Sequence, residues 1–272
     1  VQDFAVVVVD DGSTDPASKA AFWQLRDKHA ANSRWTFVEK PNGGIGETRN
    51  HAASLASTDY LVFMDADNEA EPEMVEVMVR AMAANPVDCL TCFMRAFADN
   101  SPTDAKKIIY QYTPTGPCLE AGLFSNCFGD ANFIVRKDTF LAVGGFGLRR
   151  DASFEDWEFL ARLSLRGHSQ DVIPQPLFLY RHTPGGFSRT TSSYLNHMRI
   201  IQAYGEALPD WAGRMLCDIY APIVPAAVPR EQRGGLHGPR IGLLRKLERS
   251  LRRRRKKFFA RMKSRDNGRR AA

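Results

Sequence analysis

Residues 6–15 read VVVVDDGSTD, an apolar run that ends in carboxylates and turn-forming residues. Four consecutive β-branched residues predict a strand buried on both faces, as in a parallel sheet. A second strand-like run, YLVFM at 60–64, ends in the same way, with Asp65-Ala66-Asp67. Ligands of open parallel sheets bind beyond the carboxyl ends of the strands, so the two clusters indicate one site.

Outward from these two runs, strand-like and helix-like segments alternate. Strands are expected at 4–9, 35–38, 60–64, 89–93, 132–135, 171–173 and 177–180, and helices at 16–30, 46–55, 72–83, 155–166, 194–207 and 209–220. This order predicts an α/β domain with a mostly parallel sheet flanked by helices, and an irregular stretch at 101–129. Prolines and glycines at 222–235 mark a linker. We therefore expect one domain over 1–225 and a linker with a basic tail over 226–272.

The net charge of +6 combines two opposite parts. From Arg230 onward the chain has 17 Lys or Arg against 3 Asp or Glu, a net of +14, whereas the part before it carries −8. No apolar run approaches the ~20 residues that cross a bilayer. Five cysteines are scattered, and Cys89 and Cys92 lie in an apolar strand-like run without a second metal-binding pair. They are expected to be buried thiols in a reducing cytoplasm.

The carboxylates favour a divalent cation. Asp-x-Asp on a tight turn points hard oxygen ligands outward, which suits Mg²⁺ or Mn²⁺ with a diphosphate. Turn formation and helix capping alone also explain such residues, but two clusters at one sheet edge would repel each other without a cation. Between them, PNGGIGETRN at 41–50 forms a glycine-rich loop that runs into a helix. Its amide groups and Arg49 suit an anion, although the loop lacks the lysine of a P-loop.

These motifs resemble those of the family 2 glycosyltransferases, which have the GT-A fold. VVVVDDGSTD, PNGGIGETRNHA and YLVFMDADN come in the family's order, followed by GDANFIVRKDTFLAVGGF, FEDWEFLARLSLRGH and YRHTPGGFSR. The resemblance spans roughly residues 6–189. It implies a bacterial-type enzyme that transfers a sugar from a nucleotide-diphosphate donor, most simply a UDP-sugar, to a hydroxyl of a glycan or lipid-linked glycan.

The resemblance also implies roles on the donor side. Asp11, next to Asp10, would contact the base, and Arg49 would lie near the nucleotide behind Gly43 and Gly44. Asp65 would face the ribose and the metal-bound waters, and Asp67 would bind Mn²⁺ or Mg²⁺ directly. His182 would complete the metal shell, although a lone histidine at a strand end is more often structural. Arg189 would clamp the diphosphate from a flexible lid.

On the acceptor side, Asp156 is the expected general base, which takes the proton from the attacking hydroxyl in a single displacement with inversion. Glu155 beside it either has a function or caps the helix through its charge. The resemblance places Asp130, Gly144 and Gly145 on the acceptor-side floor, and Trp157 lies next to the base.

The tail contains an amphipathic basic pattern from Ile241 to Met262. Such a helix fits an anionic membrane surface, which would place the protein at the inner face of the cell membrane. A solvated tail or a linker to a further domain is the alternative, and no fold that binds nucleic acid accompanies it. The family also has a strand about 30 residues before the DDGS motif that this sequence does not contain. We expect the sheet without that strand to be unstable or inactive.

Three other functions compete with the transferase. A sugar nucleotidyltransferase also uses strand-end carboxylates and Mg²⁺, but its glycine-rich signature near the first strand is not visible. A catalytically inactive GT-A domain that only binds need not keep both Asp67 and Asp156. A phosphate-receiver domain would be about half this size.

Overall fold

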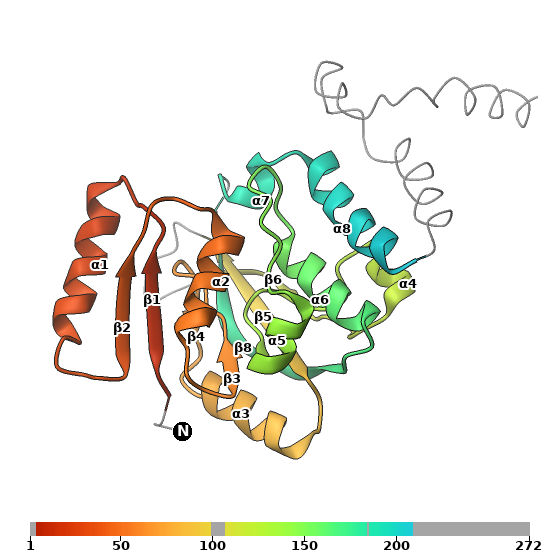
Figure 1. Cartoon of the computed structure of the whole chain (residues 1–272), viewed down its shortest axis with the longest axis horizontal. Helices are drawn as coiled ribbons and strands as arrows, with labels where there is room; N and C mark the ends of the chain where they lie inside the picture. The colour runs from red at the N-terminus through yellow and green to blue at the C-terminus, as the bar shows by residue number, and fades with distance from the viewer. Residues whose placement is uncertain (1–3, 99–106, 184, 209–272) are drawn as a thin grey trace, which may run out of the picture. The chain divides into compact units, whose positions relative to one another are not determined.

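The structure, a computed structural model, describes residues 4–98, 107–183 and 185–208 (Figure 1). The strands are β1 (Val6–Asp10), β2 (Trp35–Glu39), β3 (Tyr60–Val62), β4 (Glu69–Ala70), β5 (Cys89–Ala98), β6 (Ile108–Tyr112), β7 (Ile134–Arg136) and β8 (Gln170–His182). The helices are α1 (Pro16–Lys28), α2 (Ile45–Leu55), α3 (Met74–Ala84), α4 (Leu119–Gly122), α5 (Lys137–Val143), α6 (Glu155–Leu165), α7 (Phe187–Thr190) and α8 (Ser193–Ala207).

The strands form two separate sheets within the described residues. β1 and β2 pair in parallel, from Val6 opposite Trp35 to Asp10 opposite Glu39. The second sheet has the order β3-β7-β5-β8-β4, with β6 on β5. No described strand joins β1 to β3. The expectation that the family has a further strand before the DDGS motif stays a prediction.

The α/β class is confirmed, and the second sheet is mixed, with short antiparallel pairs beside its long parallel one. β5 and β8 pair in parallel over their length, whereas the pairs β3–β7, β5–β7, β5–β6 and β4–β8 are antiparallel. Because β7 lies antiparallel between β3 and β5, the strands β3, β5 and β8 still run in one direction. Their carboxyl ends therefore share one edge, and the chain entering β7 at Ile134 arrives at that same edge.

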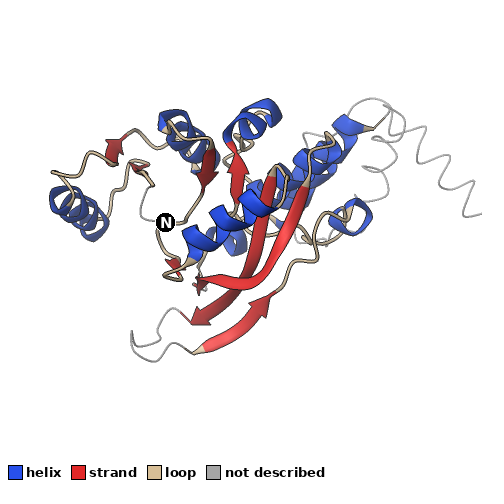
Figure 2. Ribbon diagram, turned by 90° about the horizontal axis from the view of Figure 1, so that it is seen from below, coloured by secondary structure: helices blue, strands red, loops and turns tan. Residues whose placement is uncertain are grey.

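Helices cover the six-stranded sheet and build its core. α3 packs on β5 and β8 through Met74, Met78 and Met82, which recur every four residues and are buried. α6 packs against α5 and α8. A cluster of buried aromatic residues fills the space between these helices and the sheet, and its rings include Phe63, Phe133, Phe140, Phe146 and Phe159. Figure 2 shows the curl of the long strands under the helices.

Several elements differ from the expectation. The stretch expected to be irregular contains β6 and the short α4, and α5 follows β7 directly. The two strand pieces expected near 171–180 are one strand, β8, in which the pairing with β5 shifts register around Pro176. A proline lacks the donor for a regular ladder, so sequence alone suggests a break where the sheet instead absorbs an irregularity.

The expected buried thiols are confirmed. Cys89 and Cys92 are free and buried in β5, and burial raises the pKa of both thiols. No helix in the described part of the chain is long and apolar enough to cross a membrane. The expected helix at 209–220, the domain boundary at residue 225 and the basic tail lie outside the described residues.

Candidate active site

The Asp65-Ala66-Asp67 triplet forms a turn shortly after β3, which ends at Val62, and is held by the end of β8. The Asn68 amide donates to the Asp65 carbonyl at 3.1 Å, which closes the turn. The Arg181 side chain donates to the Asp67 carbonyl at 3.0 Å, and the Arg181 amide donates to Asn68 Oδ1 at 3.1 Å. Partial burial and the charge of Asp65 raise the pKa of the Asp67 carboxyl. The turn thus presents two carboxylates that repel each other.

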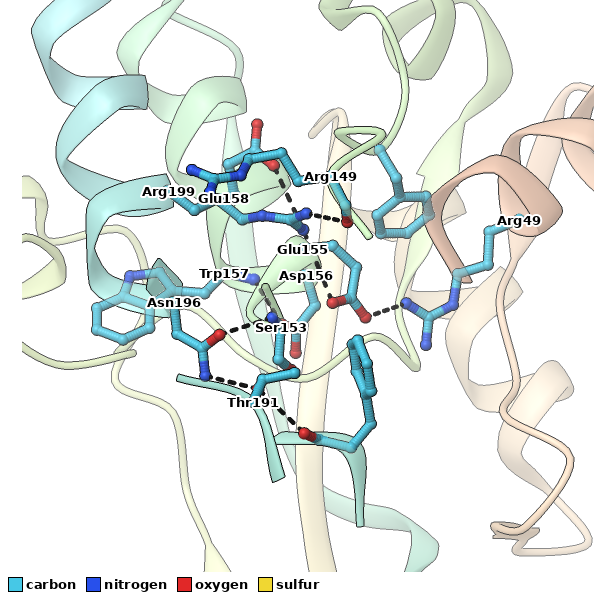
Figure 3. A network of polar contacts seen from close by, with 12 residues as sticks. Arg49, Arg149, Ser153, Glu155, Asp156, Trp157, Glu158, Thr191, Asn196 and Arg199 are labelled. Carbon is cyan, nitrogen blue, oxygen red and sulfur yellow. Dashed lines mark hydrogen bonds and ion pairs between the residues drawn. The ribbon is translucent and has the colours of Figure 1, made fainter. Parts of the chain in front are cut away.

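Arg49 links this turn to the helix that carries the predicted base. It projects from α2, is buried, and pairs with Asp65 through Nη2. Its Nη1 donates to Glu155 Oε1 at 2.7 Å (Figure 3). Its guanidinium lies 5.2 Å from the centre of the Phe146 ring. Burial opposes the charge of Arg49, but Asp65 and Glu155 raise its pKa above the ordinary value. Arg49 therefore remains charged and joins two carboxylates from distant segments.

Asp11 holds the glycine-rich loop. Its carboxylate accepts hydrogen bonds from the Gly43 and Gly44 amides, both at 2.8 Å, and from Lys40 Nζ at 2.6 Å. Despite the opposing effect of partial burial, the Gly43 and Lys40 donors lower the pKa of Asp11 to about 2. Asp10 accepts the Ser13 amide at 3.2 Å. The contact of Asp11 with a nucleotide base stays a prediction. In the structure its carboxylate fixes the loop before α2.

Asp156 lies in the first turn of α6, where its carboxylate accepts the Trp157 amide at 2.8 Å. Burial, the charge of Glu155 and the charge of Asp130 raise its pKa well above the usual range. Asp130 itself is reached by the field of Asp65, and burial together with that charge raises its pKa to about 6. Asp65, Asp130 and Asp156 thus gather around one region. A carboxyl with a raised pKa is suited to accept a proton near neutral pH.

Three of the residues expected at the acceptor side have contacts or backbone conformations that stabilise the fold. Trp157 is 4 % exposed, and its indole N–H donates to the Gly122 carbonyl at 2.8 Å. Gly144 and Gly145 have φ of +87° and +65° and end α5 in the left-handed region that favours glycine. A Cβ at Gly145 would lie 2.5 Å from Asn50 Oδ1. Trp157 thus packs on α4, and Gly145 packs closely on Asn50 of α2.

Two further predicted residues do not join the carboxylates. His182 ends β8 and makes an edge-to-face contact with Tyr110, at 6.1 Å between ring centres. Arg189, in α7, donates to the Thr183 carbonyl of its own segment at 2.9 Å. Among the described residues, no group of three His, Cys, Asp or Glu side chains is arranged to hold a metal. The role of His182 in metal binding stays a prediction.

The donor set nevertheless fits a divalent cation that is shared with a diphosphate. Mg²⁺ is commonly held by one or two carboxylates, with phosphate oxygens and water as the other ligands. Asp65 and Asp67 supply two such carboxylates on one turn. Partial burial and the charge of Asp65 raise the pKa of Asp67, and a cation would relieve the repulsion between the two carboxylates. His182 would be an imidazole ligand of the kind that suits Mn²⁺.

Sequence reasoning missed Lys40, Asn196 and Arg199. Lys40 bonds both Asp11 and Glu47, at 2.6 and 2.8 Å. Asn196 and Arg199 lie buried on α8, 1 % and 3 % exposed. The signal was present, because both occupy positions of the helix repeat that otherwise carry buried apolar residues such as Ile200 and Ala203. A polar residue at such a position indicates a specific partner.

Comparison with known proteins defines the class that this fold and site represent. The sequence model of Glycosyl transferase family 2 matches residues 1–157. The chain belongs to this family. A putative glycosyltransferase from Bacillus subtilis, EpsH, is 26 % identical over 66 % of this chain and 53 % of its own length. The glycosyltransferase GlyG of Streptococcus pneumoniae is 21 % identical over 77 % of this chain and 71 % of its own.

Two other comparisons concern part of a larger protein or the fold alone. Chondroitin synthase of Pasteurella multocida is 34 % identical over 29 % of this chain, a match to 8 % of its length. The chain thus spans about half the length of EpsH and a small part of the synthase. TarS 1–349 of S. aureus in complex with UDP-GlcNAc has a TM-score of 0.57 at 18 % identity, over 78 % of this chain and 61 % of that one. This similarity shows the GT-A fold.

Proposed function

We propose that the chain is the catalytic domain of an inverting, metal-dependent glycosyltransferase. It would transfer a sugar from a UDP-sugar to a hydroxyl group of a glycan or lipid-linked glycan, with Asp156 as the general base. Membership of glycosyl transferase family 2 and similarity to bacterial glycosyltransferases support a transferase that acts in glycan synthesis. The complexes of TarS with UDP and with UDP-GlcNAc support the choice of nucleotide for the first tests.

One observation carries this proposal. Asp65, Arg49 and Glu155 form a continuous chain of ion pairs from the carboxylate turn after β3 to the first turn of α6. Asp156 follows Glu155 directly in the first turn of α6 (Figure 3). The residues that would hold the donor are thereby linked to the residue that would activate the acceptor. This arrangement is expected of an enzyme in which both substrates must be aligned. A module that only binds a nucleotide has no need of it.

The proposed reaction is a single displacement. The oxygen of the acceptor hydroxyl forms a bond to the anomeric carbon as the bond from that carbon to the diphosphate oxygen breaks. The electron pair of the broken bond leaves with UDP, and the proton of the hydroxyl passes to the Asp156 carboxylate. Because one base suffices for this step, the paired carboxylates of a hydrolase are not required. Attack opposite to the leaving group inverts the anomeric centre.

Asp65 and Asp67 are the residues that would hold Mn²⁺ or Mg²⁺, with His182 as the third candidate. When bound there, the cation would neutralise charge on the departing diphosphate. Arg49, which stays charged, would add to the positive field on the same side of the site. The glycine-rich loop offers the N-terminus of α2 to an anion, and Asp11 fixes the shape of that loop.

A donor screen tests the function. UDP release and thermal stabilisation are measured for a panel of UDP-sugars, with and without Mn²⁺, for the wild type and the variants Asp67→Asn and Asp156→Asn. We expect Mn²⁺-dependent UDP release with at least one sugar. Asp67→Asn should abolish the metal-dependent stabilisation. Asp156→Asn should retain it and lose about 10²–10⁴-fold in turnover, the usual contribution of a general base.

Three outcomes would redirect the assignment. Metal-dependent nucleotide binding that survives Asp67→Asn would remove the triplet from the metal site. Stabilisation by UDP-sugars without any turnover would favour a binding module. Release of pyrophosphate from UTP and a sugar phosphate would favour a nucleotidyltransferase.

A further inference from the structure

We propose that Asn196 and Arg199 of α8 are positioning residues, which hold the first turn of α6 and thereby set the position of Asp156. This inference rests on the proposed function, because it assigns these two residues to the reaction of that site. Neither side chain bonds Asp156 itself; both contact the residues around it (Figure 3).

The start of α6 needs support from elsewhere in the molecule. The residue before the helix, Phe154, has φ of +69°, a left-handed conformation that bulky residues rarely adopt. Its side chain makes no capping hydrogen bond to the helix. A helix that begins from a strained residue without a side-chain cap keeps its position only when neighbouring structure fixes it. The first turn of α6 carries Glu155 and Asp156.

Asn196 supplies one of these fixing contacts. It lies 1 % exposed on α8, and its Oδ1 accepts the amide of Ser153 at 2.7 Å. Its Nδ2 donates to the Thr191 hydroxyl at 3.0 Å. Asn196 therefore ties the residues before α6 to the residue that follows α7. The segment that carries Arg189 and the helix that carries Asp156 thus share one anchor.

Arg199 supplies the second contact, through charge. It lies one helical turn from Asn196, so both side chains are on the same face of α8. Its Nη1 is 3.8 Å from Glu155 Oε2 and 3.8 Å from Glu158 Oε2, and its Nη2 donates to the Arg149 carbonyl at 2.6 Å. Glu155 is thereby held between Arg199 on one side and Arg49 on the other.

The position of Glu155 between two arginines has a structural consequence. Glu155 is 5 % exposed, and a buried carboxylate that loses one of its cations moves toward the other or toward water. Either movement displaces the backbone of the first turn, where Asp156 is the next residue. The pair Asn196 and Arg199 thus keeps Asp156 in place without touching the reacting groups. Misplacement by about 1 Å can lower turnover by about a hundredfold.

The test uses two removals, one conservative replacement and one control. Arg199→Met keeps an unbranched side chain without the charge, Asn196→Leu keeps the branched shape without the hydrogen bonds, and Arg199→Lys keeps the charge. Arg166→Met is the control. Arg166 lies at the C-terminal end of α6, far from Asp156 along the helix, and donates to the carbonyls of Ala142 and Val143. Turnover and KM for the UDP-sugar that the wild type uses are measured, with the affinity for UDP.

We expect Arg199→Met and Asn196→Leu to lower kcat by about 10- to 100-fold, whereas KM for the donor and the affinity for UDP change little. Arg199→Lys should restore a large part of the loss. The control should keep the kcat of the wild type. Equal kcat in all variants would overturn the proposal, and so would a loss of UDP affinity that matches the loss of kcat.

Amide hydrogen exchange makes the proposal testable without activity. Arg199→Met should speed exchange in residues 153–158 by about tenfold and leave 162–165 unchanged, because local opening follows the lost contacts. Unchanged exchange at 153–158, or a uniform increase along α6, would overturn the positioning role. If the wild type releases no UDP from any donor, the proposed function fails, and the exchange result still decides whether α8 holds the first turn of α6.

Discussion

At the scale of single residues, the site is governed by carboxylates in different surroundings. Asp11 accepts two amides and an ammonium group, which stabilise its charge and lower its pKa to about 2. Asp156 accepts one amide, but partial burial and the charges of Glu155 and Asp130 raise its pKa. Aspartate thus provides a charged anchor at Asp11 and a candidate proton acceptor at Asp156, and the surroundings of each carboxylate determine the difference.

The raised pKa of Asp156 predicts a pH dependence. The base is active when deprotonated, so kcat falls as pH falls through its raised pKa, at a pH above the ordinary value of 3.8. Asp130→Asn removes one of the negative charges that raise this pKa. We therefore expect the acid limb of kcat to move to lower pH in this variant.

The measurement is kcat at saturating donor over a pH series. Asp171→Asn, at the beginning of β8, is the control and should leave the limb where it is. An acid limb that stays in place in Asp130→Asn, or moves to higher pH, would contradict the assignment of Asp156 as the base.

At the scale of elements, α2 is the part that joins the two halves of the site. Its N-terminus follows the glycine-rich loop held by Asp11, and its side chains Arg49 and Asn50 bind Asp65 and the backbone of Phe146. The approach is close, because a Cβ at Gly46 would lie 2.3 Å from the Gly147 carbonyl oxygen. Glycine at this position therefore serves packing between elements.

Gly46→Ala tests this contact with a clear sign. In an isolated helix the change to alanine would stabilise by about 1 kcal/mol. Here we expect a destabilisation of about 1–3 kcal/mol from the clash with the Gly147 carbonyl, or a decrease in Tm on the order of 5 °C. Gly185→Ala is the control, because a Cβ there meets nothing within 4 Å. An increase in Tm for Gly46→Ala would contradict the close packing.

The elements also show where sequence patterns are sufficient. The strand before Asp10, the helix after Pro16 and the amphipathic α3 follow from local composition and periodicity, and the structure contains all three. Strand direction in the second sheet did not follow, because it depends on β7 being inserted between β3 and β5. β6 was not expected either. Its pairing with β5 stabilises it as a strand, and that pairing is not visible in the local sequence.

At the scale of the whole molecule, the chain combines an acidic domain with a basic tail of net charge +14 from Arg230 onward. We propose that the tail binds anionic membranes. Each basic residue near such a surface contributes ~1 kcal/mol, so deletion of residues 226–272 should lower binding to anionic vesicles by more than about tenfold. Binding of the full chain should also weaken as the salt concentration rises.

Co-sedimentation with vesicles of neutral and of anionic lipid provides the measurement. Equal binding to both, or equal binding with and without residues 226–272, would remove the membrane hypothesis. The domain itself provides a matched control, because it carries −8 before Arg230.

The amino-acid sequence by itself determined the α/β class, the family, the two carboxylate clusters and the candidate base, because these depend on local runs and motif order. Only the tertiary structure decided which residues meet. Arg49 and Glu155 are 106 residues apart and form an ion pair, and Arg199 reaches the same carboxylate from α8. Such pairs depend on how the helices pack over the sheet, and no local pattern in the sequence encodes that packing. The pKa of Asp156 is raised by burial, by its neighbour Glu155 and by Asp130; the burial and the approach of Asp130 come from the fold.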